Sequence, residues 1–430
     1  MTQESGADRV FLFLQGPHGP FFQGLGTMLR HSGAKVYRVG FNAGDAFFWN
    51  DKKTFIPFLD KPDAWADFFE KTVIDKGVTD IALYGDTRDI HAKAVKIAKE
   101  RGIGVHIFEE GYLRPFWVTY ERGGSNGNSR LMDMTIPQMQ KALERSDMET
   151  PMPPSHWGDM RHHVFYGALY HWFVMFKNRK FENFKPHRDL SVVREFRLYM
   201  RRLMRMPIHA IERRVATRRI RFGGFPYHLA LLQLEHDSSF QKHSPFNTMT
   251  EFLELVIENF AIGAPQHHHL VFKAHPLEDG RVPVRRTIVR LAKEYGISDR
   301  VHFVRGGKLA QLLNDARTAV TVNSTAGQQV LWRGIPLKIF GKAVYDQPEF
   351  IADESLRHFF AGAKRPDMMA YREYRRFLLE TSQVTGGFYS RRGRRQLLRH
   401  VVDMMLSRED PYDALESGTA APRQQLRSVN

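Results

Sequence analysis

Two short motifs in the second half of the chain contain residue types that bind phosphate. In the first, Lys273 and His275 lie in the sequence Lys-Ala-His-Pro, directly after an apolar run that predicts a strand. Lysine supplies a positive charge and histidine a hydrogen-bond donor, so the pair can bind a nucleotide phosphate without a metal ion. The alternative is a histidine that only caps a turn, and the motif alone leaves both interpretations open.

The second motif is a run of small polar residues between a predicted strand and a predicted helix. Its candidate ligand-binding residues are Asn323, Ser324, Thr325 and Gly327. Hydroxyl groups and the amides of a helix start bind anions, although serine and threonine are also ordinary N-caps. The Lys-x-His-Pro motif lies one strand–helix unit earlier, so we expect both motifs at one edge of one sheet, which favours phosphate binding.

Two adjacent carboxylates follow another predicted strand, in the first half of the chain. Glu109 and Glu110 begin the sequence Glu-Glu-Gly-Tyr-Leu-Arg-Pro, which also contains Arg114. A carboxylate at a strand end can act as a general base or as a nucleophile, and the following glycine lets a ligand approach the backbone. The alternative is a pair of solvent-facing acids in a turn, balanced by Arg114.

Two further sequences are less specific. Residues 15–20 read Gln-Gly-Pro-His-Gly-Pro, where Gln15, Gly16 and His18 either hold a sugar or an acceptor or form a tight turn. They lack both the Gly-x-Gly-x-x-Gly pattern and the lysine of a phosphate-binding loop. The histidines at 267–269 look like a metal site, but consecutive residues of a strand alternate between its faces. We therefore expect no metal ion and no cofactor.

The motifs lie in two stretches where predicted strands and helices alternate. Such alternation is typical of α/β folds with a doubly wound parallel sheet, whose ligands bind beyond the carboxyl ends of the strands. Two Rossmann-type units facing a cleft form the GT-B architecture, which is the fold that we expect. The predicted strands are 10–14, 35–39, 80–84 and 105–108 in the first stretch, and 228–234, 269–273, 301–304, 319–322 and 336–340 in the second.

The length of the chain, 430 residues, is enough for two or three domains. We expect a Rossmann-like N-terminal domain over 8–150 with acceptor and catalytic groups, and a Rossmann-like C-terminal domain over 225–406 that binds the nucleotide. A basic, aromatic-flanked helical insert at 151–224 is predicted between them. A polar, mobile tail is predicted at 407–430.

The charge of the chain indicates an anionic partner. There are 63 Lys and Arg against 47 Asp and Glu, a formal net charge of +16, and residues 177–221 hold 15 basic residues against four acidic ones. A basic helix predicted at 190–220, next to an aromatic cluster, can lie on an anionic membrane. The alternative is a solvated basic face. The candidate membrane-binding residues are Arg201, Arg202, Arg205, Arg213, Arg214, Trp172 and Phe173.

Composition also limits the chemistry and the compartment. The absence of cysteine excludes disulfides, zinc–thiolate sites, iron–sulfur clusters and a cysteine nucleophile. The polar N-terminus is unlike a signal peptide, and the apolar stretch 164–176 is too short to span a bilayer. We expect a cytoplasmic protein, peripheral on the inner face of the inner membrane.

Taken in order, the motifs resemble those of the capsule polysaccharide biosynthesis and export family of the KpsS/LipB type, related to the KpsC proteins. The resemblance rests on the Gln-Gly-Pro strand end, Glu-Glu-Gly-Tyr-Leu-Arg-Pro, Leu-Gln-Leu-Glu-His-Asp-Ser, Lys-Ala-His-Pro and Asn-Ser-Thr-Ala-Gly. It runs from about residue 10 to residue 350. Relatives usually have Glu-Asp-Gly where this chain has Glu109-Glu110-Gly111, so the second carboxylate here is one methylene longer.

The resemblance implies a retaining β-Kdo glycosyltransferase. It would take Kdo from CMP-Kdo and add it to a (lyso)phosphatidylglycerol-type lipid, which starts the linker of a capsular polysaccharide. Glu110 would be the nucleophile or base, and Glu109 a supporting or alternative carboxylate. Lys273 and His275 would hold the CMP phosphate and stabilise it as it leaves. The other residues implied at the donor are Gln233, Asp237, Ser324 and Thr325.

Two other functions compete with this interpretation. A non-catalytic factor of capsule export or assembly could keep the fold, although Glu110, Lys273 and His275 favour an enzyme. A nucleic-acid-binding protein could use the basic stretch, but no recognised nucleic-acid module is present, so we expect no nucleic acid as partner. In either case the expected protein partners are other proteins of capsule biosynthesis and export.

Overall fold

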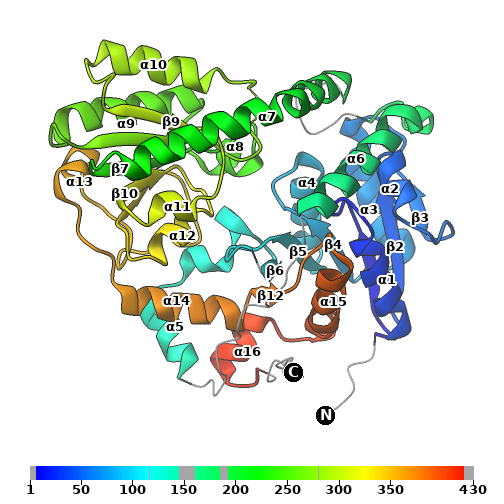
Figure 1. Cartoon of the computed structure of the whole chain (residues 1–430). Coiled ribbons are helices and arrows are strands. Elements are labelled where there is room, and N and C mark those ends of the chain that lie inside the picture. The colour runs from blue at the N-terminus through cyan, green and yellow to red at the C-terminus, as the bar shows by residue number, and fades with distance from the viewer. Residues whose placement is uncertain (1–5, 116, 145–159, 185–191, 279, 421–430) are drawn as a thin grey trace, which may run out of the picture. The chain divides into compact units, whose positions relative to one another are not determined.

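The computed structural model describes residues 6–115, 117–144, 160–184, 192–278 and 280–420 (Figure 1). The chain divides into two compact units. Unit 1 comprises Met1–Arg130, Pro137–Val193 and Arg375–Asn430, and unit 2 comprises Leu131–Ile136 and Arg194–Tyr374. Each unit is built around one sheet.

The sheet of unit 1 has seven strands in the order β12-β6-β5-β4-β1-β2-β3. Strands β1 to β5 are parallel, while β6 is antiparallel to β5 and β12 is antiparallel to β6. The run β3-β2-β1-β4-β5-β6 has the strand order of a doubly wound nucleotide-binding fold. The bounds are β1 (Val10–Phe13), β2 (Lys35–Gly40), β3 (Phe55–Pro57), β4 (Asp80–Tyr84), β5 (Gly104–Glu110), β6 (Trp117–Arg122) and β12 (Gln383–Thr385).

Helices cover both faces of this sheet. Successive apolar side chains of β1 point to opposite faces, so each face needs a layer of helices to bury them. Phe11 and Phe13 pack with α1 (Phe21–His31) and α15 (Arg391–Leu406) on one face. Leu12 and Leu14 pack with α3 (Trp65–Lys76) and α4 (Asp89–Glu100) on the other. The remaining helices of this unit are α2 (Ala43–Phe47), α6 (Met160–Phe176) and α16 (Pro411–Ser417), and most of α5 (Ile136–Leu143).

The sheet of unit 2 has five parallel strands in the order β11-β10-β7-β8-β9. Its order reverses between β7 and β10, and ligands of such sheets bind at this point, beyond the carboxyl ends of the strands. The bounds are β7 (Tyr227–Leu231), β8 (His269–Lys273), β9 (Val301–Val304), β10 (Ala316–Thr321) and β11 (Leu337–Ile339).

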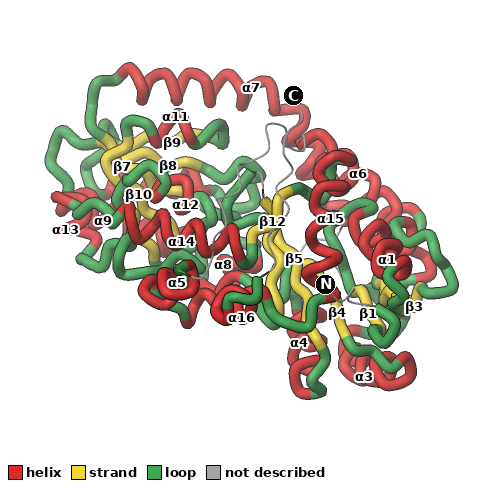
Figure 2. The backbone as a smooth tube through the Cα atoms, turned by 90° about the horizontal axis from the view of Figure 1, so that it is seen from below, coloured by secondary structure: helices red, strands yellow, loops and turns green. Residues whose placement is uncertain are grey.

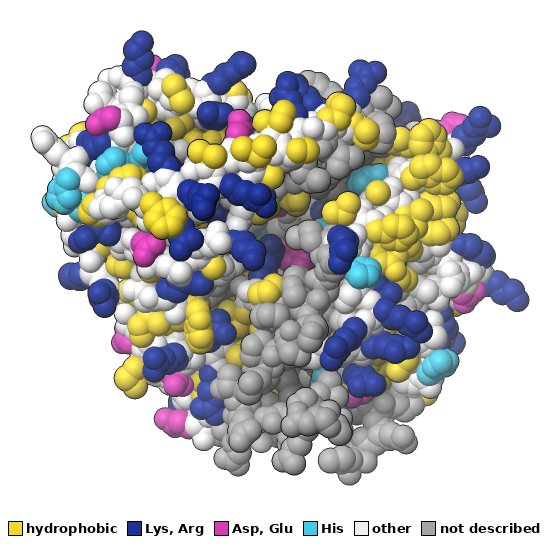
Figure 3. Space-filling model, viewed as in Figure 1, with side chains coloured by type: hydrophobic (Ala, Val, Ile, Leu, Met, Phe, Trp, Pro, Cys, Tyr) yellow, Lys and Arg dark blue, Asp and Glu magenta, His cyan; other side chains and the backbone are white. Residues whose placement is uncertain are grey.

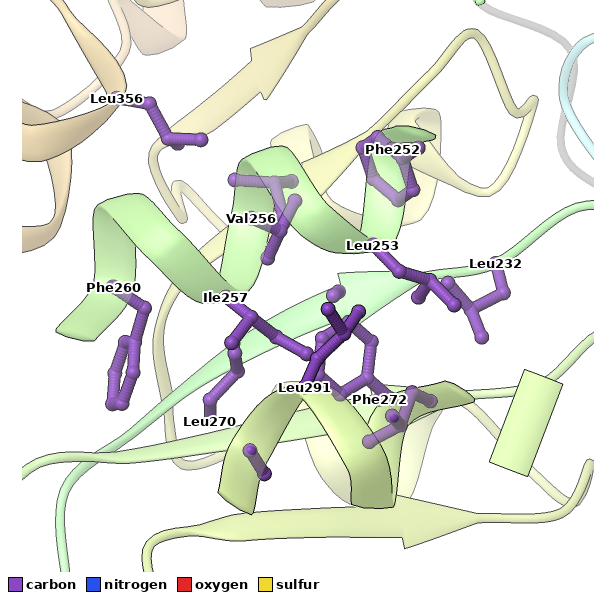
Figure 4. Packing of buried hydrophobic residues seen from close by; sticks show 14 of the residues in the cluster. Leu232, Phe252, Leu253, Val256, Ile257, Phe260, Leu270, Phe272, Leu291 and Leu356 are labelled. Atoms are coloured by element: carbon purple, nitrogen blue, oxygen red, sulfur yellow. The ribbon is translucent and has the colours of Figure 1, made fainter. Parts of the chain in front are cut away.

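One face of this sheet is covered by α9 (Met249–Gly263), α10 (Val284–Glu294) and α13 (Leu356–Gly362). Figure 4 shows the apolar side of α9 packed on Leu270 and Phe272 of β8 and on Leu291 of α10. Each fully buried side chain of this kind contributes about 1.5–3 kcal/mol, so the packing fixes β8 and its carboxyl end firmly. The shorter helices are α8 (Ser238–His243), α11 (Ala310–Leu313) and α12 (Gly327–Leu331), and unit 2 ends within α14 (Met368–Glu380), whose last residues belong to unit 1.

The basic stretch from residue 192 onward forms one long helix, α7 (Val192–Phe222), which confirms the helix predicted at 190–220 over its described part. It continues through Pro207. Figures 1 and 2 both show α7 beside β9 and α11 of unit 2. Phe222 ends the helix, and the chain then enters β7.

The two units divide the chain differently from the predicted boundaries. The stretch 151–224 does not form a separate insert, because α6 belongs to unit 1 and nearly all of α7 to unit 2. Residues 375–406, expected in the C-terminal domain, return to unit 1 with β12 and α15. The expected tail includes α16, which buries Tyr412 and Leu415, while residues 421–430 lie outside the described part of the chain.

Candidate active site

The carboxyl end of β8 places a buried lysine where a ligand phosphate is expected. Lys273 is only 6% exposed. Burial, and then the positive charge of Arg213 on α7, lower the pKa of Lys273 to about 8. Among the described residues no carboxylate forms an ion pair with Lys273. A buried cation without a carboxylate partner is suited to receive an anionic ligand.

His275 follows in the turn after β8 and is half-buried. Its Nδ1 accepts a hydrogen bond of 3.1 Å from the amide of Leu277. In the neutral ring the proton therefore lies on Nε2, which makes this nitrogen a donor, as a phosphate ligand requires. The structure thus brings Lys273 and His275 to the same strand end, as the motif predicts.

Gln233 and Asn323 meet at the point where the strand order of unit 2 reverses. The side-chain amide of Gln233 donates to Oδ1 of Asn323 over 2.7 Å, and the backbone amide of Asn323 donates to Oε1 of Gln233 over 2.9 Å. The Asn323 amide nitrogen also donates to the carbonyl oxygens of Ser239 and His243. The two residues therefore hold the loops after β7 and β10 together, and their amides are used within the protein.

The rest of the small-residue motif has mixed roles. Ser324 and Thr325 are half-buried, and Ser324 Oγ accepts from the amide of Ala326 over 3.2 Å. A Cβ on Gly327 would overlap the hydroxyl of Tyr345, so close packing requires this glycine. Helix α12 has only five residues, so its dipole adds little to anion binding. Asp237 is exposed at the start of α8.

Glu110 is the last residue of β5 and lies in an aromatic surround. The hydroxyls of Tyr84 and Tyr389 donate to its Oε1 over 3.4 and 3.2 Å. His163 of α6 stacks on Tyr389, with ring centroids 4.3 Å apart and an interplanar angle of 5°. Burial lowers the pKa of His163, and the negative charge of Glu110 opposes this shift. Glu110 is therefore a half-buried carboxylate held in place by two phenols.

Glu109 projects to the other face of β5, because successive residues of a strand alternate. Its Oε1 would lie 2.8 Å from a Cβ placed on Gly85, so it faces the loop after β4. The two carboxylates thus project to different faces of β5, although burial raises the pKa of Tyr84 and the charges of both carboxylates add to this shift. Arg114 is exposed and donates from Nε to the carbonyl oxygen of Gly111 over 3.2 Å.

The glycine-containing loop after β1 is held in place by hydrogen bonds of Gln15 with other parts of unit 1. Gln15 is buried, accepts a hydrogen bond of 2.8 Å from Arg88 and donates one of 2.9 Å to the Tyr170 hydroxyl. His18 stacks on the Tyr170 ring at 4.4 Å. A Cβ on Gly16 would lie 2.5 Å from the ring of Phe22, so packing explains this glycine.

The candidate membrane residues separate into different environments. Arg201, Arg205 and Arg214 are exposed on α7, whereas Arg213 is half-buried and lies beside the loop after β9. The side chain of Arg202 lies outside the described residues. On α6, Trp172 is 45% exposed, and Phe173 stacks on Phe47 at 3.9 Å. The described part of the chain has no helix long and apolar enough to cross a bilayer.

The histidine run shows the alternation that the sequence predicts. His268 is bonded to His228 of β7 at 3.0 Å, and its neighbour His269 is bonded to His302 of β9 at 2.8 Å. His267 is exposed. Within the described ranges no three His, Asp or Glu side chains lie close enough together to hold a metal ion.

Sequence comparison assigns the chain to a family. The sequence model described as "Capsule polysaccharide biosynthesis protein" matches residues 79–389, a range that contains both Glu110 and the motifs around Lys273 and Asn323. The chain belongs to the capsule polysaccharide biosynthesis protein family. The resemblance drawn from the motifs is therefore confirmed.

Two curated capsule proteins are similar to this family member over most of its length. The capsule polysaccharide export protein KpsS of Escherichia coli is 32% identical over 386 residues, which cover 89% of this chain and 97% of KpsS. The capsule polysaccharide modification protein LipB of Neisseria meningitidis serogroup A is 30% identical over 88% of this chain and 91% of LipB.

Solved structures with lower identity were also found. KpsC of Thermosulfurimonas dismutans, titled a beta Kdo 2,7 transferase, has a TM-score of 0.38 and 13% identity, covering 85% of this chain and 98% of KpsC. The MnaA–UDP structure of S. aureus has a TM-score of 0.31 and 9% identity, covering 85% of this chain and 94% of that one.

Several residues of the two sites were missed in the sequence. Tyr84, His163 and Tyr389 surround Glu110 but come from three distant parts of the chain, so no local pattern connects them. Arg213 was assigned to a membrane surface because it lies in a run of basic residues. The pair Gly306-Gly307 after β9 was the available signal, since paired glycines at a strand end allow another group to come close.

Proposed function

We propose that this protein is a retaining glycosyltransferase that moves a β-Kdo residue from CMP-Kdo to a (lyso)phosphatidylglycerol-type lipid, starting the linker of a capsular polysaccharide. The observation that carries the proposal is Lys273, a buried cation at the carboxyl end of β8 with His275 two residues later. Membership of the capsule polysaccharide biosynthesis family supplies the pathway.

Unit 2 holds the donor in this proposal. The phosphate of the cytidylate lies against Lys273 and the Nε2–H of His275, with the hydroxyls of Ser324 and Thr325 as further donors. Negative charge grows on this phosphate as its bond to the sugar breaks, so fixed cations stabilise the transition state more than the ground state. These groups can balance the negative charge of a single phosphate without a metal ion.

Unit 1 supplies the carboxylate. As a nucleophile, Glu110 would bond to the anomeric carbon as cytidylate leaves, and the acceptor hydroxyl would then displace it, so that two inversions give retention. As a base, it would take the proton of the acceptor hydroxyl, and retention would then require this hydroxyl to attack the anomeric carbon from the face that cytidylate leaves. Tyr84 and Tyr389 fix Oε1 in either role. Glu109 faces the loop after β4, which makes it the weaker candidate.

The acceptor explains the surface of α7. Met204, Ile208, Ile211 and Val215 are 70%, 60%, 64% and 62% exposed, and their spacing of four, three and four residues places them on one side of the helix. We call these four residues the α7 apolar stripe. Figure 3 shows apolar side chains gathered along α7. The exposed residues that flank the stripe are Arg201, Arg205, Arg214 and Arg218.

An apolar stripe between arginines is the pattern of a helix that lies on an anionic bilayer. We therefore propose that α7 holds the protein at the inner face of the membrane, where a phospholipid acceptor is found. The pattern favours this function over nucleic-acid binding, since phosphate backbones offer no surface to an apolar stripe. Arg213 lies on the opposite side of the helix and takes no part in this surface.

A non-catalytic export factor is the second candidate, because the relative KpsS is named an export protein. Purified protein incubated with short-chain lysophosphatidylglycerol and either CMP-Kdo, CMP-sialic acid or UDP-N-acetylglucosamine separates the two. A transferase for Kdo releases CMP from CMP-Kdo only when the lipid is present. Equal background release of the nucleotide from all three donors, CMP from the first two and UDP from the third, with and without lipid, would favour the export factor.

A further inference from the structure

Arg213 lies on the inner side of α7, at the same sheet edge as Lys273. The two cations are close enough for Arg213 to lower the pKa of Lys273, although burial is the larger cause. The preceding residue, Glu212, pairs with Arg285 and Arg305 at 3.8 Å. Glu212 therefore connects α7 to α10 through Arg285 and to the first residue of the loop after β9 through Arg305, and Arg213 lies over that loop.

Gly307 makes room for Arg213. A Cβ on Gly307 would lie 2.6 Å from Cδ and 3.2 Å from Cγ of Arg213, so any other residue here would displace the arginine. Gly306 offers a contrast at the next position. It also has a positive φ, 62° against 85° for Gly307, but the nearest atom to its added Cβ is Cα of Pro276 at 3.6 Å.

The charges at this edge are unbalanced. Among the residues that the structure describes, neither Lys273 nor Arg213 forms an ion pair with a carboxylate, and the acidic neighbour Glu212 is directed to Arg285 and Arg305. Two like charges held together at a buried strand end raise the energy of the empty site. An anion that binds both cations removes this cost.

We propose that Arg213 is a donor-binding residue, which holds the phosphate of the nucleotide together with Lys273. The inference rests on the proposed function and deepens it, since it assigns α7 two roles. Its outer side lies on the lipid surface and its inner side completes the donor site. Arginine suits this role because its planar group can donate two parallel hydrogen bonds to one phosphate.

The test measures the affinity of CMP and of UDP by calorimetry for the whole protein and for matched variants. Arg213→Gln should weaken binding of the nucleotide by about tenfold or more, the loss expected for one charge-assisted hydrogen bond. Arg213→Lys keeps the charge and should recover part of the affinity. Arg214→Gln removes an exposed arginine next to it and should leave the affinity unchanged.

The glycine pair supplies a second, independent comparison. Gly307→Ala should weaken nucleotide binding in the same way as Arg213→Gln, whereas Gly306→Ala, with similar backbone strain, should retain it. Thermal unfolding verifies that each variant is folded. The inference is overturned if Arg213→Gln and Arg214→Gln have equal affinity, or if neither nucleotide binds the parent protein. If UDP binds in an Arg213-dependent way and CMP does not, the proposed donor is wrong but the role of Arg213 stands.

Discussion

Lys273 has an ammonium group whose pKa lies closer to neutral pH than that of an ordinary lysine. Burial and Arg213 lower its pKa to about 8. The lysine is charged below this pH and becomes neutral above it. Any anion held by Lys273 therefore binds tightly below pH 8 and loses one interaction above it.

This gives a prediction for nucleotide affinity. The affinity of the parent protein for CMP should fall as the pH rises from about 7 to about 9.5, by up to about 2 kcal/mol, because the loss is at most about 1.4 kcal/mol for each pH unit above the Lys273 pKa of about 8. Lys273→Arg keeps its charge over this range, so its affinity should depend less on pH. Calorimetric titrations at four pH values measure both. A parent profile as flat as that of the variant would contradict the role of Lys273.

At the residue scale, local motifs predicted some positions and not others. Lys273 and His275 could be placed from the sequence because they lie within three residues of each other at the end of one predicted strand. Gly327 could not, since the reason for this glycine is a clash with Tyr345, 18 positions later in the chain. The phenols around Glu110 were missed for the same reason, because Tyr389 reaches it across 279 positions.

Histidines connect the strands of unit 2 near their amino ends. His228 contacts Thr318 at 2.8 Å and His268 at 3.0 Å, and His269 contacts His302 at 2.8 Å. Burial is the main reason that the pKa values of His228, His268 and His302 are lowered to about 3, 4 and 4. In the unfolded chain these groups titrate near 6.5, so the unfolded state binds more protons between about pH 4 and pH 6.5.

The free energy of unfolding should therefore fall as the pH is lowered below 6.5. Urea unfolding at pH 7.5, 6.0 and 5.0, followed through tryptophan fluorescence, measures this loss. His228→Gln should make the stability less dependent on pH, while His267→Gln, an exposed histidine of the same run, should leave the dependence unchanged. If both variants show the same dependence of stability on pH, the buried His228–His268 pair is not the cause of the loss of stability at low pH.

Helix α7 is the element whose surface predicts membrane binding. Each basic residue near an anionic bilayer contributes about 1 kcal/mol, and the attraction is screened by salt. Replacing Arg201, Arg205 and Arg214 with Gln should release the protein from phosphatidylglycerol vesicles at physiological salt. Replacing Ile208, Ile211 and Val215 with Ser should remove the binding that persists at high salt.

Sedimentation with vesicles across a salt series distinguishes the two contributions, with phosphatidylcholine vesicles as the uncharged control. Arg213 is left intact in both variants, so nucleotide affinity should be unchanged. If the parent protein binds no phosphatidylglycerol vesicle at any salt, α7 is not a membrane helix.

At the scale of the element, the sequence predicted α7 as a helix but not its two sides. The basic residues dominate the stretch, and the sequence alone does not show which of its residues face the solvent. The apolar stripe becomes visible only when exposure separates Met204, Ile208, Ile211 and Val215 from the half-buried positions such as Arg213.

At the scale of the whole molecule, the alternation of strands and helices predicted two doubly wound units. The five parallel strands of unit 2 and the strands β1, β2, β4 and β5 of unit 1 follow from apolar runs that end in polar clusters, whereas the short parallel strand β3 was not predicted. The return of residues 375–420 to unit 1 could not be predicted. Strand β12 has only three residues, and its pairing with β6 joins positions more than 260 residues apart.

The groups proposed for the two parts of the reaction lie in different units. Unit 2 carries the cations for the cytidylate, and unit 1 carries Glu110. A substitution in one unit should therefore affect one part only. Glu110→Gln keeps the size of the side chain and removes its charge, so it should stop transfer while CMP affinity remains.

The mass of the lipid product is the most direct test of the central claim. The parent protein is incubated with CMP-Kdo and short-chain lysophosphatidylglycerol, and the lipid is analysed by mass spectrometry over time. We predict a lipid heavier by one Kdo residue, formed at least about 100-fold more slowly by Glu110→Gln, the scale of a lost general base or nucleophile, and much less affected by Glu109→Gln. A lipid of unchanged mass with the folded parent protein, or full transfer by Glu110→Gln, would contradict the account.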